Sequence, residues 1–167
     1  RDEAQWIEQC LAKDIPALGL CLGAQLLAHV LGGPVAPHDK GAQEFGLYPI
    51  KAVDQQTSFV PEDFFAVQFH TRGFEVPKDA ERLAAGDIFP NQAFRYGDNV
   101  LGTQFHPECT LAILRRWQAL DAAPWQAPGV QAREEQDRLA ACHLNNVRHW
   151  FERLLGDFFA SRTDNAH

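Results

Sequence analysis

The sequence has little of what marks several specialised protein classes. No apolar run approaches the roughly 20 residues of a membrane span, and no segment has the layout of a signal peptide, so we expect a cytoplasmic protein with no membrane partner. The 4 cysteines lack the close pairing of a zinc ribbon. We therefore expect no metal site, and we predict Cys10 and Cys142 to be buried small hydrophobic residues in helical patterns.

Basic charge is also scarce. The chain has 15 Lys+Arg against 22 Asp+Glu, which gives a formal net charge of −7, and the basic residues are scattered, so we expect no nucleic-acid partner. The composition of 46% hydrophobic and 11% aromatic residues is that of a globular protein. A length of 167 residues suits one domain, so we treat residues 1–167 as a single unit.

The order of the predicted elements indicates an α/β fold. An N-terminal helix is followed by a short buried strand at 15–20 and a helix at 23–31. Strand-like segments are then expected at 47–53, 64–70, 82–85, 92–96 and 100–106, with a hairpin turn at 97–99 between the last two. Two helices follow: one from the capping residue Thr110 to about 120, and an amphipathic one over 131–160 that we expect to cover the core.

Cys21 lies at a sharp junction between the predicted strand and the next helix. Gly19 and Gly23 stand two residues away on each side, and such small residues allow the tight strand-to-helix turn of a nucleophile elbow. The amide of Leu22 would then be free to donate to an oxyanion. Amides at a helix N-terminus also favour a thiolate, so we predict that Cys21 is a nucleophile.

A base for this nucleophile is predicted in the segment Phe105-His106-Pro107-Glu108. Parallel sheets bring strand ends that are distant in sequence to one edge, so His106 and Cys21 are expected to meet there. Glu108 follows closely enough to accept a hydrogen bond from the imidazole and fix its tautomer, as in other catalytic triads. A zinc site at His106 and Cys109 is the competing interpretation, but no second Cys/His pair lies nearby.

These motifs resemble the class I glutamine amidotransferases, in the branch that includes the glutaminase domain of GMP synthetase. The resemblance covers about residues 1–120 and includes the segment Glu44-Phe45-Gly46. It implies a Rossmann-like, three-layer fold with a mixed, mostly parallel sheet. It also implies hydrolysis of the side-chain amide of L-glutamine through a γ-glutamyl thioester, with no cofactor, and delivery of the ammonia to a separate synthetase subunit.

The resemblance also implies roles for individual residues. Cys21 would be the nucleophile, His106 the general base and acid, and Glu108 the residue that orients His106. Glutamine, or another γ-glutamyl amide, would be bound by a further set of residues. This set is Gly23, Gln25, His70 and Gln104.

Two departures from the family pattern bear on these expectations. The branch usually has His-Gly-Asp where this chain has His70-Thr71-Arg72, which leaves the specificity and the acceptor open. Family domains also carry several strands before the elbow, so we expect this chain to be N-terminally incomplete. Two alternatives remain: a γ-glutamyl peptidase or hydrolase with the same triad, and a non-catalytic regulatory domain of the same fold.

Overall fold

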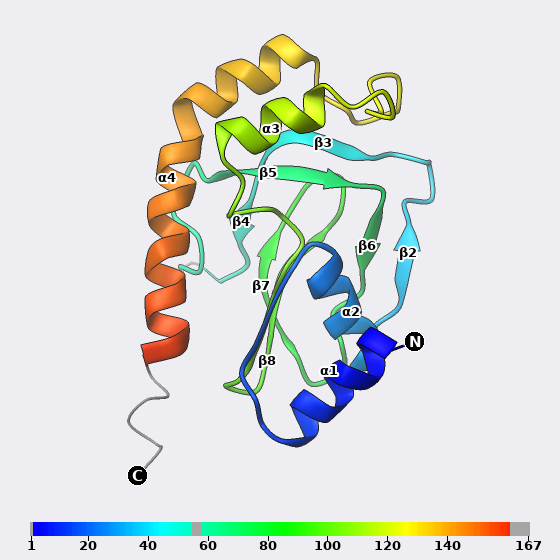
Figure 1. The fold of residues 1–167 in the computed structure, drawn as a ribbon, viewed down its shortest axis with the longest axis vertical. Coiled ribbons are helices and arrows are strands. Elements are labelled where there is room, and N and C mark those ends of the chain that lie inside the picture. The colour runs from blue at the N-terminus through cyan, green and yellow to red at the C-terminus, as the bar shows by residue number, and fades with distance from the viewer. Residues whose placement is uncertain (1, 55–57, 161–167) are drawn as a thin grey trace.

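The computed structural model describes residues 2–54 and 58–160 (Figure 1). Residue 1 and residues 161–167, the two ends of the expected domain, lie outside the described residues. The helices are α1 (Asp2–Ala12), α2 (Leu22–Val30), α3 (Leu111–Gln118) and α4 (Arg133–Ala160). The strands are β1 (Ala17–Leu20), β2 (Val35–Pro37), β3 (Glu44–Pro49), β4 (Lys51–Ala52), β5 (Phe65–His70), β6 (Arg72–Phe74), β7 (Glu81–Ala85), β8 (Asn91–Tyr96) and β9 (Val100–Thr103).

The central sheet has the strand order β1-β9-β8-β7-β4, and two-stranded sheets form from β2 with β6 and from β3 with β5. The α/β class and the mixed sheet are confirmed. Parallel pairing within the described residues is confined to β1 and β9, and the other ladders are antiparallel. Short connections explain this, because the turn at 97–99, with Gly97 at φ 55°, can only join antiparallel neighbours.

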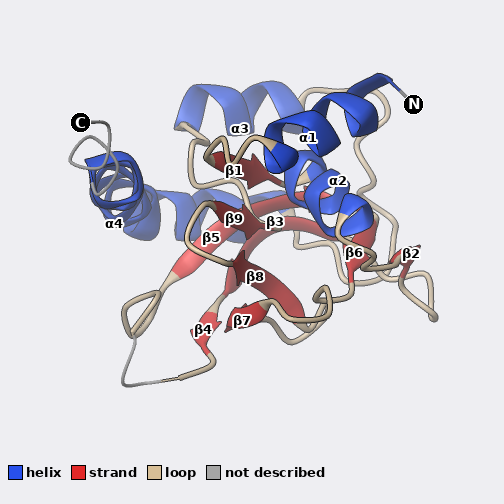
Figure 2. Cartoon of the chain, turned by 90° about the horizontal axis from the view of Figure 1, so that it is seen from below, coloured by secondary structure: helices blue, strands red, loops and turns tan. Residues whose placement is uncertain are grey.

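Helices cover both faces of the central sheet, which gives the three layers expected. Successive strand residues point to opposite faces, and Ala93 and Phe94 of β8 accordingly enter different hydrophobic clusters. Phe94 packs with α2, and α1 lies beside α2 on that face (Figure 2). Ala93 lies in the cluster that contains Val147 and Trp150 of α4.

Helix α4 lies within two residues of its expected range and packs on its own chain. Its buried residues include Leu139, Val147 and Trp150, and the Trp150 indole donates a hydrogen bond to the Phe59 carbonyl at 2.9 Å. The same helix also contacts β3 and β5. It therefore connects the two-stranded β3–β5 sheet, which carries residues of the site described below, to the central sheet.

Several predicted strand boundaries were wrong. The segment expected at 47–53 is two strands, since β3 begins at Glu44 and the chain breaks at Ile50 before β4. The strand expected at 100–106 ends at Thr103, because the chain leaves the central sheet there to meet β5. Strands β2 and β6 lie outside the segments that the sequence predicted as strands.

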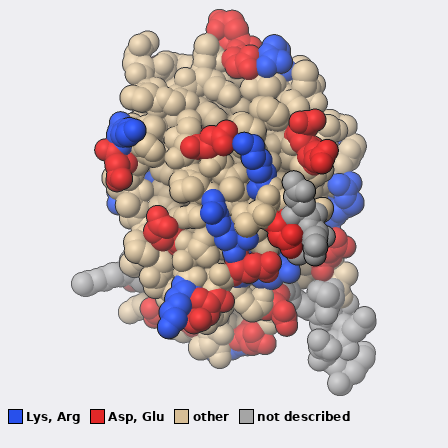
Figure 3. Space-filling model, turned by 180° about the vertical axis from the view of Figure 1, so that it is seen from behind, with Lys and Arg blue, Asp and Glu red and all other residues tan. Residues whose placement is uncertain are grey.

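The surface carries mixed charges. On the face shown in Figure 3, acidic and basic side chains are interspersed, and no large area of one sign is visible. Among the helices of the described residues, none has the length and hydropathy needed to cross a membrane.

Candidate active site

Cys21 occupies a strained turn between β1 and α2. Its φ of 48° and ψ of −104° lie in a region that non-glycine residues rarely adopt and that is often found at functional sites. The Cys21 amide donates to the Thr103 carbonyl at 2.8 Å, and the Cys21 carbonyl accepts from the Gln25 amide at 3.0 Å. Both sides of the turn are thus held by backbone hydrogen bonds, as the elbow requires.

The two flanking glycines have different roles. A Cβ at Gly19 would lie 2.6 Å from the Gly23 carbonyl carbon and 2.6 Å from Leu27 Cδ1, so only glycine allows α2 to pack this closely on β1. At Gly23 nothing lies within 4 Å of the position of a Cβ. Gly23 therefore leaves open space two residues from Cys21.

His106 reaches the site because β1 and β9 are adjacent parallel strands, with Leu20 in register with Thr103. The histidine lies beyond the end of β9 instead of within it. Its amide donates to the Val67 carbonyl of β5 at 2.8 Å in an isolated bridge. The expected meeting of Cys21 and His106 at one sheet edge is thus observed, with β5 holding the histidine segment.

The side chains of Cys21 and Glu108 both lie beside His106. The His106 Nδ1 lies 2.7 Å from Glu108 Oε1, and the remaining ring nitrogen is available to Cys21. Burial lowers the pKa of His106, but hydrogen bonds to Cys21 and Glu108 and their negative charges raise it more strongly, to about 9. The His106 ring also packs edge-on against Trp117 at 4.9 Å. This arrangement fits a base held in one tautomer by a carboxylate.

Gln104 contacts Cys21, and Gln25 contacts Gln104. The Gln104 Nε2 donates to Cys21 Sγ at 3.7 Å. The Gln25 Nε2 donates to Gln104 Oε1 at 3.2 Å and to the Arg72 carbonyl at 2.8 Å. Both residues were expected to bind substrate; the structure places them in contact with the nucleophile or with each other.

His70 lies behind the site. Its side chain is 3% exposed and its Nε2 lies 2.9 Å from Glu44 Oε2. Its Nδ1 lies 2.9 Å from the Arg72 carbonyl. Both ring nitrogens thus contact protein atoms, which leaves neither for the substrate contact that the sequence led us to expect. Glu44 was noted in the sequence only as part of a motif, because its partner is remote in sequence and no local signal links them.

Leu22 is the first residue of α2. Its side chain is exposed, so the group of interest is its backbone amide. The first amides of a helix have no acceptor within the helix. The Leu22 amide therefore lies at the start of α2, directly after Cys21, and its predicted role as an oxyanion donor stays a prediction.

The other cysteines differ from Cys21. Burial raises the pKa of the Cys109 thiol to about 12, so the free thiol is protonated at neutral pH and is a poor nucleophile. Cys10 is buried as predicted, but Cys142 is exposed, because it lies on the outer side of α4. Among the described residues, no group of three or more His, Cys, Asp or Glu side chains is arranged to hold a metal ion.

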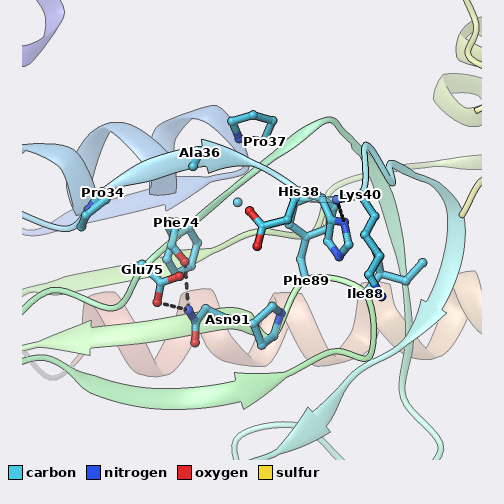
Figure 4. A pocket seen from close by; sticks show the side chains of 13 residues that line it. Pro34, Ala36, Pro37, His38, Lys40, Phe74, Glu75, Ile88, Phe89 and Asn91 are labelled. Atoms are coloured by element: carbon cyan, nitrogen blue, oxygen red, sulfur yellow. Dashed lines mark hydrogen bonds between the residues drawn. The ribbon is translucent and has the colours of Figure 1, made fainter. Parts of the chain in front are cut away.

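Two cavities lie elsewhere. One of about 380 Å³ lies along β2 and β6 and is lined by His38, Lys40, Glu75 and Asn91, among others (Figure 4). The other, of about 1040 Å³, is lined in part by Arg95 and Trp150. Neither is lined by Cys21, His106 or Glu108. The candidate site is thus defined by side chains at strand ends.

The fold and the site define an α/β protein with a cysteine, Cys21, at a strand-to-helix elbow. The model of the class I glutamine amidotransferase family matches residues 1–115. The chain therefore belongs to this family.

Relatives and solved structures agree with this assignment. The chain is 37% identical over 99 residues to a subunit of the glutamine-hydrolysing GMP synthase from Sulfolobus acidocaldarius, which covers 57% of this chain and 52% of that protein. It is 36% identical over 110 residues to a GMP synthase from Thermomicrobium roseum, covering 64% of this chain and 20% of that protein. The chain thus spans only about half or less of the length of these relatives.

A glutamine amidotransferase structure from Thermotoga maritima superposes with a TM-score of 0.80 at 30% identity, covering 93% of this chain and 67% of that one. A second, from Methylobacillus flagellatus, has a TM-score of 0.79 at 24% identity, covering 89% of this chain and 64% of that one. This second likeness shows the fold alone.

Proposed function

We propose that this chain carries the glutaminase centre of a class I glutamine amidotransferase, which hydrolyses the side-chain amide of L-glutamine. The observation that carries the proposal is the series from Cys21 through His106 to Glu108 at the ends of adjacent strands. Family membership supports the same activity.

In the proposed reaction, the Cys21 thiolate attacks the side-chain carbonyl carbon of glutamine. The Leu22 amide stabilises the oxyanion that forms, and protonated His106 gives its proton to the departing nitrogen. This step releases ammonia and leaves a γ-glutamyl thioester on Cys21. His106, now neutral, takes a proton from water, and the resulting attack frees glutamate and the thiol. Glu108 holds the imidazole orientation throughout.

The raised pKa of His106, about 9, suits this sequence. A histidine that is protonated near neutral pH beside a thiol stabilises the thiolate, and it supplies the proton that the leaving nitrogen needs. The open space at Gly23 is where we place the substrate.

We further propose that the ammonia is used by a separate protein. The relatives from Sulfolobus acidocaldarius and Methanococcus maripaludis are named as single subunits of GMP synthase, which suggests a synthetase partner for this chain as well. Because a nucleophilic thiol requires reducing conditions, we propose a cytoplasmic location.

The test is ammonia release from L-glutamine by the wild type and by Cys21→Ala. Cys142→Ala is the matched control, since it removes an exposed thiol remote from the site. We expect activity that is lost with Cys21 and kept with Cys142. Cleavage of γ-glutamyl dipeptides without cleavage of glutamine would instead assign a γ-glutamyl hydrolase. Inactivity on both, even with the synthetase partner present, would favour a non-catalytic domain.

A further inference from the structure

A buried set of polar side chains extends from β3 and β5 to the nucleophile. It consists of Glu44, Gln68, His70, Gln92, Gln25 and Gln104, all of them buried. Some of the oxygens it contacts can only accept hydrogen bonds: the Glu44 carboxylate and the carbonyls of Phe89 and Arg72. These fixed acceptors determine the orientation of every amide in the set.

One branch runs from Gln92 through Gln68 to His70. The Gln92 amide nitrogen must face its two acceptors, Glu44 Oε2 at 3.2 Å and the Phe89 carbonyl at 3.1 Å. Its oxygen therefore accepts from Gln68 Nε2 at 2.7 Å. The Gln68 oxygen is then left to face His70 Nε2 at 3.0 Å. Glu44 and Gln68 thus both present oxygens to this ring nitrogen.

The other ring nitrogen is fixed in the same way. His70 Nδ1 lies 2.9 Å from the Arg72 carbonyl, which can only accept. His70 Nδ1 therefore donates to the Arg72 carbonyl, and Nε2 on the other side of the ring lies 2.9 Å from Glu44 Oε2. The buried Glu44 side chain thus holds the ring in the orientation that directs Nδ1 at Arg72.

The second branch runs from the Arg72 carbonyl to Cys21. Gln25 must turn its amide nitrogen toward this carbonyl at 2.8 Å, and the same nitrogen donates its second hydrogen to Gln104 at 3.2 Å. Gln104 must accept there with its oxygen. Its nitrogen is consequently the atom that faces Cys21 Sγ at 3.7 Å.

We propose that Glu44 and His70 are a positioning pair: by holding the Arg72 carbonyl, they fix the Gln25 and Gln104 amides so that an N–H, and not a carbonyl oxygen, faces the Cys21 sulfur. An N–H stabilises a thiolate, whereas a carbonyl oxygen would repel it. The pair never touches the substrate. Its effect on turnover rests on the proposed glutaminase function, but its effect on thiol reactivity does not.

Two substitutions of His70 test this series of hydrogen bonds from His70 through Arg72, Gln25 and Gln104 to Cys21, which we call the relay. The amide nitrogen of asparagine takes a place close to that of Nδ1, so His70→Asn keeps the donor to the Arg72 carbonyl. The amide nitrogen of glutamine takes a place close to that of Nε2, so His70→Gln keeps the contact to Glu44 and loses the donor to Arg72. The two variants thus separate the relay from burial of the ring.

The readout is the rate at which iodoacetamide alkylates Cys21, measured without glutamine by mass analysis of the Cys21 peptide. Both variants are measured well below their melting temperatures. We expect His70→Gln to slow alkylation by about fivefold to tenfold, the effect of one lost hydrogen bond of ordinary strength. His70→Asn should stay close to the wild-type rate, and kcat should follow the same order while KM changes little.

Equal rates in the wild type and His70→Gln, or equal losses in both variants, would overturn the proposal. If His70→Gln does not fold, Gln25→Met interrupts the same relay next to Gln104, and an unchanged alkylation rate there would overturn it too. Failure of the glutaminase function would show separately, as wild-type protein that releases no ammonia while its Cys21 still reacts with iodoacetamide.

Discussion

At the scale of single residues, the crowding at Gly19 gives a direct prediction. Gly19→Ala places a methyl group 2.6 Å from both the Gly23 carbonyl carbon and Leu27 Cδ1. Such overpacking costs about 1–3 kcal/mol, and it also pushes α2 away from the elbow. We expect a lower free energy of unfolding in urea together with slower alkylation of Cys21. If Gly19→Ala is as stable as the wild type, the turn has more room than the structure indicates.

Gly23→Ala is the matched variant with the opposite expectation. Nothing lies within 4 Å of the added methyl group, and alanine favours a helix by about 0.5–1 kcal/mol over glycine, so stability should not fall. The methyl group enters the space in which we place the substrate. We expect turnover of glutamine to fall about tenfold or more, since small displacements at a reacting centre have large effects. Unchanged turnover would mean that the substrate does not bind at Gly23.

The raised pKa of His106 predicts a dependence of stability on pH. The folded-state pKa is about 9 against 6.5 for an ordinary histidine. Its stabilising contribution is therefore complete below 6.5 and is lost as the pH rises through about 9. We expect the urea midpoint of the wild type to fall between about pH 6 and pH 10 by more than that of His106→Gln. If the urea midpoints of the two proteins change equally with pH, the raised pKa of His106 is contradicted.

The residues around Cys21 show which parts of the site can be predicted from the sequence and which cannot. Cys21, His106 and Glu108 each belong to a short motif with recognisable chemistry, and the structure brings these three together. The partnership of Glu44 and His70 depends on the register of two antiparallel strands. No local pattern encodes that register, so the sequence suggested a substrate contact for His70 where the structure shows a buried pair.

At the scale of elements, α4 is predicted to contribute through its buried aromatic residue. Trp150 packs against Phe64 and Phe59 with ring centroids 4.9 Å and 5.4 Å apart. Trp150→Ala should cost about 3–5 kcal/mol. Phe159→Ala is the control on the same helix, where a half-exposed ring should change stability by less than about 0.5 kcal/mol. Thermal unfolding of both variants checks this; similar losses would mean that α4 is not anchored at Trp150.

Elements with strong local signals were predicted well, and those without were missed. The hairpin turn at 97–99 and the cap at Thr110, which accepts from the Ile113 amide at 3.3 Å, both follow from local chemistry. Strands β2 and β6 pair over only three residues each. They contain Pro37 and Gly73, which are poor strand formers, so only their pairing across a long stretch of chain makes them strands.

At the scale of the whole molecule, the hydrophobic clusters are connected through shared strands. Ala66 and Val67 of β5 point into two different clusters, and Ala93 and Phe94 of β8 do the same. Loss of either strand therefore opens two clusters at once. The β3–β5 sheet that carries the Glu44–His70 pair is thus tied to the sheet that carries Cys21, which a relay between them requires.

This connectivity predicts a single cooperative unfolding transition. Cys10 lies in α1, which packs on the cluster around α2, whereas Cys109 lies in the cluster beneath α4, and both thiols are buried. Labelling of each thiol across a urea series should give one common midpoint that coincides with the loss of helical circular dichroism, as two-state unfolding requires. If α1 opened independently, Cys10 would react at lower urea than Cys109. Two separate midpoints would mean that α1 opens in urea while the β3–β5 sheet stays folded, and the clusters would then not form one cooperative unit.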